Sequence, residues 1–87
     1  MTRTKLSKIV EQYPDENILK ADGFDGAVIG YCIDRGEFRL VYSEDKCIDI
    51  LMRDMSEIDA IEYFDYNVSG SYVGPKTPIW VKNYQTI

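Results

Sequence analysis

The chain has 87 residues, of which 45% are hydrophobic and 13% aromatic, and its 15 acidic and 10 basic residues give a net charge of −5. The length predicts a single small globular domain over residues 1–87, and the apolar content argues against a disordered chain. The acidic balance argues against nucleic-acid binding, because phosphate-binding proteins carry basic stripes. No apolar run approaches the roughly 20 residues of a membrane span, and no signal-peptide pattern is seen, so we expect a cytoplasmic protein that does not bind membranes.

The first predicted element is an amphipathic helix over residues 4–12. Its apolar residues recur at intervals of three and four, as on one face of a helix: Leu6, Ile9 and Val10. Pro14 then ends the helix, because the residue before a proline is disfavoured in the helical conformation.

A β-hairpin is predicted to follow. Residues 27–33 are rich in β-branched and aromatic residues in both alternation phases, which predicts a strand covered on both faces. Residues 38–42 predict its partner strand. The turn at 34–37 contains Gly36, which suits the left-handed position of a bulged hairpin.

Two capped helices and a last strand complete the predicted fold. Ser43 and Ser56 are each followed by acidic residues, a pattern typical of helix N-termini. The second of these helices carries an apolar stripe: Ala60, Ile61, Phe64 and Val68. Residues 79–81 follow a proline and predict an edge strand. The order predicts an α+β fold, in which a small antiparallel β-sheet, made of the hairpin plus a C-terminal edge strand, packs against two to three short α-helices.

The segment ADGFDG, residues 21–26, places Asp22 and Asp25 three residues apart before the first strand. A calcium loop needs acids at alternating positions and a glutamate at its last position, so the spacing does not fit. Glycines that lead into a strand also lack the helix N-terminus of a phosphate-binding loop. We interpret the segment as a glycine-rich turn with Phe24 packed beneath it, and a metal or small-molecule site stays open as the alternative.

The sequence lacks the usual residues of a catalytic centre. It contains no histidine, which is the commonest general base and metal ligand. Its two cysteines, Cys32 and Cys47, are too few for a structural zinc site and are expected to be buried free thiols. No phosphate-binding loop or nucleophile motif is present. We therefore expect no enzymatic activity and no cofactor.

The last predicted helix has an unusual outer face. Away from the apolar stripe it carries acidic residues and tyrosines: Asp59, Glu62, Tyr63, Asp65 and Tyr66. Tyrosine is enriched at protein interfaces, and carboxylates favour a partner with a basic surface. This face is therefore the predicted partner-binding site, and a solvated helix face is the alternative.

Three segments, residues 18–31, 39–51 and 60–80, resemble a group of small proteins encoded by tailed bacteriophages and prophages. The resemblance spans about residues 13–82, and its most specific part is "AIEYFDYNVSGSYVGPKTPIW". It implies a phage gene product that acts in the cytoplasm of an infected bacterial cell, and it implies no catalytic or ligand residues.

The resemblance and the residues together favour a non-catalytic protein that binds another protein. In a phage setting such a protein inhibits a host or defence protein, which is our first hypothesis. The alternatives are a small-molecule or metal-binding module, which would use the Asp22–Asp25 turn, and a minor phage assembly or structural component.

Overall fold

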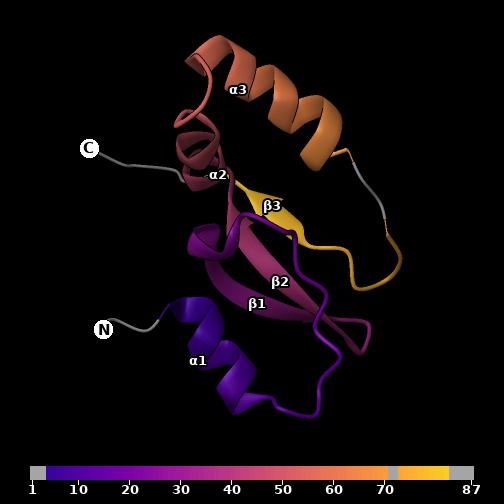
Figure 1. Cartoon of the computed structure of the whole chain (residues 1–87). Coiled ribbons are helices and arrows are strands. Elements are labelled where there is room, and N and C mark those ends of the chain that lie inside the picture. The colour runs from indigo at the N-terminus through magenta and orange to yellow at the C-terminus, as the bar shows by residue number, and fades with distance from the viewer. Residues whose placement is uncertain (1–3, 71–72, 83–87) are drawn as a thin grey trace, which may run out of the picture.

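The computed structural model describes residues 4–70 and 73–82. Within these residues, helices pack on one face of a three-stranded sheet, which confirms the predicted α+β fold (Figure 1). In chain order the elements are α1 (Lys5–Gln12), the short 3-10 helix η1 (Asp25–Ala27), β1 (Val28–Asp34), β2 (Glu37–Ser43), α2 (Glu44–Leu51), α3 (Glu57–Tyr63), the π-helical turn η2 (Phe64–Val68) and β3 (Ile79–Val81).

The sheet is mixed, with the strand order β1-β2-β3. β1 and β2 pair antiparallel, but β3 pairs with β2 in parallel. The prediction of an antiparallel sheet is therefore wrong for the third strand. The reason is the connection: α2, α3 and η2 lie between the two strands, and such a long crossover lets the chain enter β3 in the same direction as β2, where it pairs with Val41–Ser43.

The hairpin turn is tighter than predicted. Asp34 pairs with Glu37, so only two residues form the loop. Both have positive φ, 53° at Arg35 and 81° at Gly36, as in the two-residue turns that match the strand twist. The left-handed Gly36 is confirmed, whereas the bulge lies elsewhere, at the register shift between Val28 and Gly30.

β2 lies at the centre of the core. Its side chains that face the helices are buried, as alternation along a strand predicts: Phe38, Leu40 and Tyr42. Tyr31 of β1 stacks on Phe38 with ring centroids 4.9 Å apart. The predicted covering of both faces of β1 is wrong, because only its first residue is buried and Ile33, near the hairpin end, is 59% exposed.

α1 begins after Thr4, whose hydroxyl accepts a backbone N–H of the first turn at 3.1 Å. Leu6 and Ile9 are buried in the core, as predicted. Val10 is 47% exposed, so its predicted place on the buried face is wrong. The residues that contact the core follow the line from Leu6 through Ile9 to Tyr13, and Val10 lies beside this line.

The N-caps of α2 and α3 are confirmed. The hydroxyl of Ser43 accepts the backbone N–H of Lys46 at 3.3 Å, and that of Ser56 accepts the backbone N–H of Asp59 at 3.2 Å. Each bond satisfies a backbone donor that the first helical turn leaves without an acceptor. The two serines therefore fix where the helices begin and, with them, the direction of the crossover.

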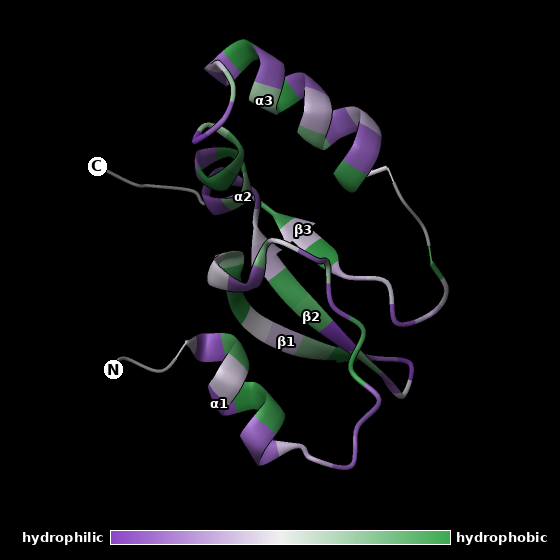
Figure 2. Ribbon diagram, in the orientation of Figure 1, coloured by the Kyte–Doolittle hydropathy of each residue, from purple (hydrophilic) through white to green (hydrophobic). Residues whose placement is uncertain are grey.

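α3 and η2 form one continuous helical segment with hydrophobic and hydrophilic residues alternating along it (Figure 2). Three of the four predicted stripe residues are buried: Ala60, Phe64 and Val68. Ile61 is 41% exposed, so its predicted burial is wrong. The buried residues recur every four positions, and this spacing continues through η2, whose π-helical turn is wider than an α-helical turn. Ile61 falls outside this spacing and lies on the side of the helical segment that faces away from the core.

Candidate partner-binding site

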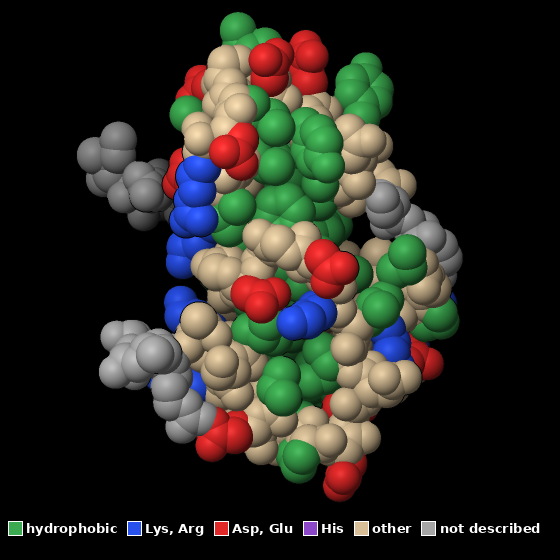
Figure 3. Space-filling model, viewed as in Figure 1, with side chains coloured by type: hydrophobic (Ala, Val, Ile, Leu, Met, Phe, Trp, Pro, Cys, Tyr) green, Lys and Arg blue, Asp and Glu red, His purple; other side chains and the backbone are tan. Residues whose placement is uncertain are grey.

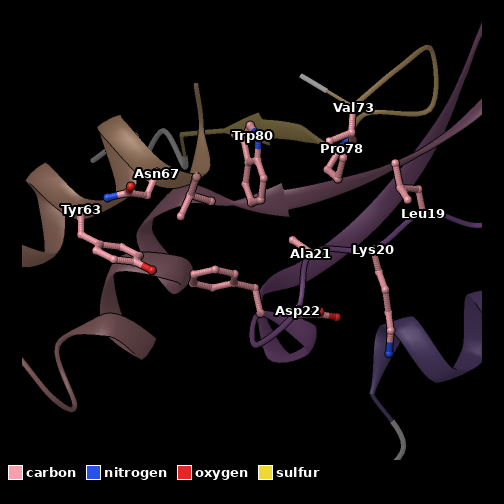
Figure 4. Close-up of a pocket in the computed structure, with 11 residues that line it drawn as sticks. Leu19, Lys20, Ala21, Asp22, Tyr63, Asn67, Val73, Pro78 and Trp80 are labelled. Atoms are coloured by element: carbon pink, nitrogen blue, oxygen red, sulfur yellow. The ribbon is translucent and has the colours of Figure 1, made fainter. Parts of the chain in front are cut away.

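An open groove with a volume of about 330 Å³ lies between α3–η2 and the loop that precedes η1. Its apolar lining consists of Leu19, Ala21, Phe24, Val68, Val73, Pro78 and Trp80. Its polar lining consists of Lys20, Asp22, Tyr63 and Asn67 (Figure 4). In the space-filling view, hydrophobic side chains gather below α3, and acidic side chains lie above and below them (Figure 3).

Trp80 of β3 joins the groove to the core. Its ring centroid lies 4.8 Å from that of Tyr42, 5.4 Å from that of Phe64 and 6.4 Å from that of Phe24. The indole Nε1 is buried and has no hydrogen-bond partner in the described part of the chain. Such unsatisfied buried donors are rare in folded proteins. The side chain is therefore held by aromatic packing and not by a hydrogen bond.

Tyr42 anchors the loop that forms one wall of the groove. The backbone N–H of Ala21 donates to the Tyr42 hydroxyl at 2.8 Å. Burial raises the pKa of Tyr42 above its ordinary value, against a smaller lowering by this hydrogen bond. The loop then turns at Gly23, with φ of 89°, and places Phe24 in the core. The predicted glycine-rich turn with Phe24 beneath it is thus confirmed.

The two aspartates of this loop differ in their surroundings. Asp25 forms an ion pair with Lys20 at 3.6 Å, and both side chains are half-exposed, so the pair adds little stability. Asp22 lines the groove, and its carboxylate makes no hydrogen bond or ion pair within residues 4–70 and 73–82. In the close-up the Lys20 side chain extends away from Trp80 and Tyr63 (Figure 4). The carboxylate at the rim is therefore not neutralised by a neighbour.

All five residues of the predicted partner-binding site are exposed: Asp59, Glu62, Tyr63, Asp65 and Tyr66. Tyr66 is 83% exposed, whereas Tyr63 is 45% exposed and lines the groove. Asp59 lies one helical turn before Tyr63, on the same side of α3. Ile58 was not part of the prediction, although it is 71% exposed. Of the remaining groove residues, Asp22 belongs to the turn that the sequence leaves open as an alternative site, whereas the others come from segments distant in sequence and carry no signal of their own.

Replacing Tyr42 with phenylalanine tests the anchor of the loop. The substitution leaves the Ala21 N–H without its acceptor, so we expect the free energy of unfolding to fall by about 1–3 kcal/mol. We also expect faster hydrogen exchange at the Ala21 amide, because the loop opens more often. Urea denaturation and exchange measured by NMR check both results. The control Tyr66→Phe, at an exposed hydroxyl, should change neither, and unchanged exchange in Tyr42→Phe would contradict the anchor.

The described residues contain no group of three or more His, Cys, Asp or Glu side chains placed to hold a metal ion. None of the helices in residues 4–70 and 73–82 is long and apolar enough to cross a membrane. Both cysteines are free thiols, as predicted, but only Cys47 is buried, so the predicted burial of Cys32 is wrong. The sequence matches no protein-family model, and neither a curated protein nor a solved structure matches it.

Proposed function

We propose that the chain acts by binding another protein, without catalysis, and that α3 with the adjoining groove is the binding surface. The observation that carries the proposal is the exposure of large apolar side chains on this one helical segment. Ile58, Tyr63 and Tyr66 are 71%, 45% and 83% exposed. Such side chains, when they cluster on a small protein, mark interaction sites, and tyrosine in particular is enriched at interfaces.

The charge of this segment supports a partner with a basic surface. No lysine or arginine occurs between Arg53 and Lys76. Over the same stretch Asp59, Glu62 and Asp65 are exposed. A surface of one sign speeds association with a surface of the opposite sign and disfavours partners of its own sign. The segment therefore combines apolar contact area with selection for basic partners.

The resemblance of residues 13–82 to small phage proteins supports a biological setting for this binding. We propose that the partner is a protein of the bacterial host, or of its defence against phage, and that binding inhibits it. A small acidic domain inhibits by covering a basic functional surface, and this requires only affinity and shape. Turnover by the chain itself has no part in this proposal.

Affinity capture from lysate of phage-infected bacteria tests the proposal. We expect the wild-type chain to retain one host protein, and Tyr66→Ala or Asp59→Lys to reduce its capture by about tenfold or more, as for interface hot spots. Asp49→Lys is the matched control, because Asp49 is exposed on α2 and the change in charge is the same. Melting temperatures establish that each variant folds. Equal capture by all variants would refute α3 as the binding surface.

A further inference from the structure

We propose that the groove binds the side chain of an arginine or lysine of the partner protein, with Asp22 as its counter-ion. This inference rests on the proposed function, because it names the chemistry by which the same surface recognises its partner. It follows from three properties of the groove: its apolar walls, its aromatic rings and its unpaired carboxylate.

The walls of the groove fit the apolar stem of such a side chain. Leu19, Val73 and Pro78 line one end and Trp80 lies beside them (Figure 4). Arginine and lysine carry three or four methylene groups before the charged tip, and they bury these groups along apolar surfaces. The open groove leaves Leu19 and Val73 37% and 61% exposed. A bound stem would cover part of the exposed surface of both side chains.

The charged tip fits the remaining groups. The Asp22 carboxylate has no hydrogen bond or ion pair in the described part of the chain, so it is available as an acceptor for a charge-assisted hydrogen bond. Tyr63 and Trp80 add aromatic rings to the same groove, and cations are attracted to the faces of such rings. Lys20, the basic residue of the lining, is paired with Asp25 and extends away from these rings.

Other occupants fit less well. A purely aliphatic or aromatic side chain would fill the apolar part but would draw the Asp22 carboxylate out of water without a partner, which is unfavourable. An acidic side chain would be repelled by Asp22 and by the carboxylates of α3. A cationic side chain with a long stem satisfies both parts of the groove, and it agrees with the basic surface expected of the partner.

The tryptophan of the groove supplies a direct test, since Trp80 is the single tryptophan of the chain and its fluorescence reports on its surroundings. The probes are three peptides of the form acetyl-Gly-X-Gly-amide, in which X is arginine, its uncharged isostere citrulline, or norleucine. We expect the arginine peptide to change the emission saturably, with a dissociation constant on the order of millimolar. The citrulline and norleucine peptides should bind about tenfold more weakly or not at all.

Two variants of equal net charge locate the effect. Asp22→Asn should weaken binding of the arginine peptide by about tenfold or more, because it removes the counter-ion at nearly unchanged size. Asp15→Asn should leave binding unchanged, because Asp15 is exposed and does not line the groove. Tyr63→Phe should retain binding and Tyr63→Ala should weaken it, since the proposal requires the ring and not the hydroxyl.

Three results would overturn the inference: no saturable change with the arginine peptide, equal affinity for arginine and citrulline, or tighter binding of norleucine. The last result would identify an apolar anchor. Each is distinguishable from failure of the proposed function. If Tyr66→Ala and Asp59→Lys lose capture of the host protein while Asp22→Asn captures it as well as the wild-type chain does, α3 stands as the binding surface and the cation site falls. If the arginine peptide binds but Tyr66→Ala and Asp59→Lys capture the host protein as well as the wild-type chain does, the cation site stands and α3 falls as the binding surface.

Discussion

Replacing Phe64 with alanine is expected to lower the free energy of unfolding by about 3–5 kcal/mol. Phe64 is fully buried, and its ring packs edge-on against Trp80 with centroids 5.4 Å apart. Its removal leaves a cavity that short elements cannot close. A domain of this size has a total stability of roughly 4–13 kcal/mol, so the variant should lose a large part of it. Urea denaturation followed by circular dichroism measures the change.

Ile61→Ala is the matched control for this prediction. Ile61 precedes Phe64 by three residues and has a similar apolar surface, but it is 41% exposed on the outer side of α3. Its replacement is expected to change the free energy of unfolding by less than about 1 kcal/mol. A loss comparable to that of Phe64→Ala would mean that Ile61 is buried, as the sequence pattern alone predicts, and that the helical segment faces the sheet differently.

Local signals in the sequence predict the elements of this fold well. Ser43 and Ser56 are followed by acids within one turn, and both cap helices through hydrogen bonds to nearby amides. The alternation from Phe38 to Tyr42 identifies the buried face of β2. In each case the physical cause acts within a few residues, either as a cap satisfying free backbone donors or as the two-residue period of a strand. Such causes are visible without knowledge of the tertiary structure.

Features that depend on contacts between distant segments were not predicted. The parallel pairing of Trp80 with Tyr42 is set by the path of the crossover, which no local pattern records. The exposure of Ile61 follows from the π-helical turn at Phe64–Val68, because a regular helical period places Ile61 nearer the stripe. Both errors concern how elements meet, and not which elements form.

The candidate site was predicted in part for the same reason. Tyr63 belongs to an outer helix face that is visible in the sequence, and the structure places it at the groove. The sequence places Asp22 in a turn, but its position at the groove depends on the Ala21 amide being held by Tyr42. Trp80 reaches the groove through a strand pairing that closes only after the crossover. A groove assembled from three separate segments has no signature in any one of them.

Alkaline pH is expected to destabilise the protein over a defined window. Burial, with a smaller effect of Glu44, raises the pKa of the Cys47 thiol from 9.0 to about 12, and burial also raises the pKa of Tyr42 above its ordinary value of 10.0. Both groups therefore ionise more readily in the unfolded chain than in the native one. Their contribution to stability is fully present below the unfolded pKa and is lost as the pH rises through the native pKa. For Cys47 this window extends from pH 9.0 to about 12.

The loss attributable to Cys47 is on the order of 4 kcal/mol over the full window, since each unit of pKa shift corresponds to about 1.4 kcal/mol. Thermal melting followed by circular dichroism from about pH 7 to about pH 12 measures it. Cys47→Ala is expected to melt lower at neutral pH, because a buried side chain is truncated, but its stability should fall less steeply above pH 9.0. Cys32→Ala, which keeps the buried thiol, should retain the steep fall. Parallel melting curves for the wild-type chain and Cys47→Ala would show that the thiol does not drive the alkaline transition. The residual slope of Cys47→Ala would then come from other groups with a raised pKa, which include Tyr42, through burial, and Tyr13, through its hydrogen bond with Tyr31.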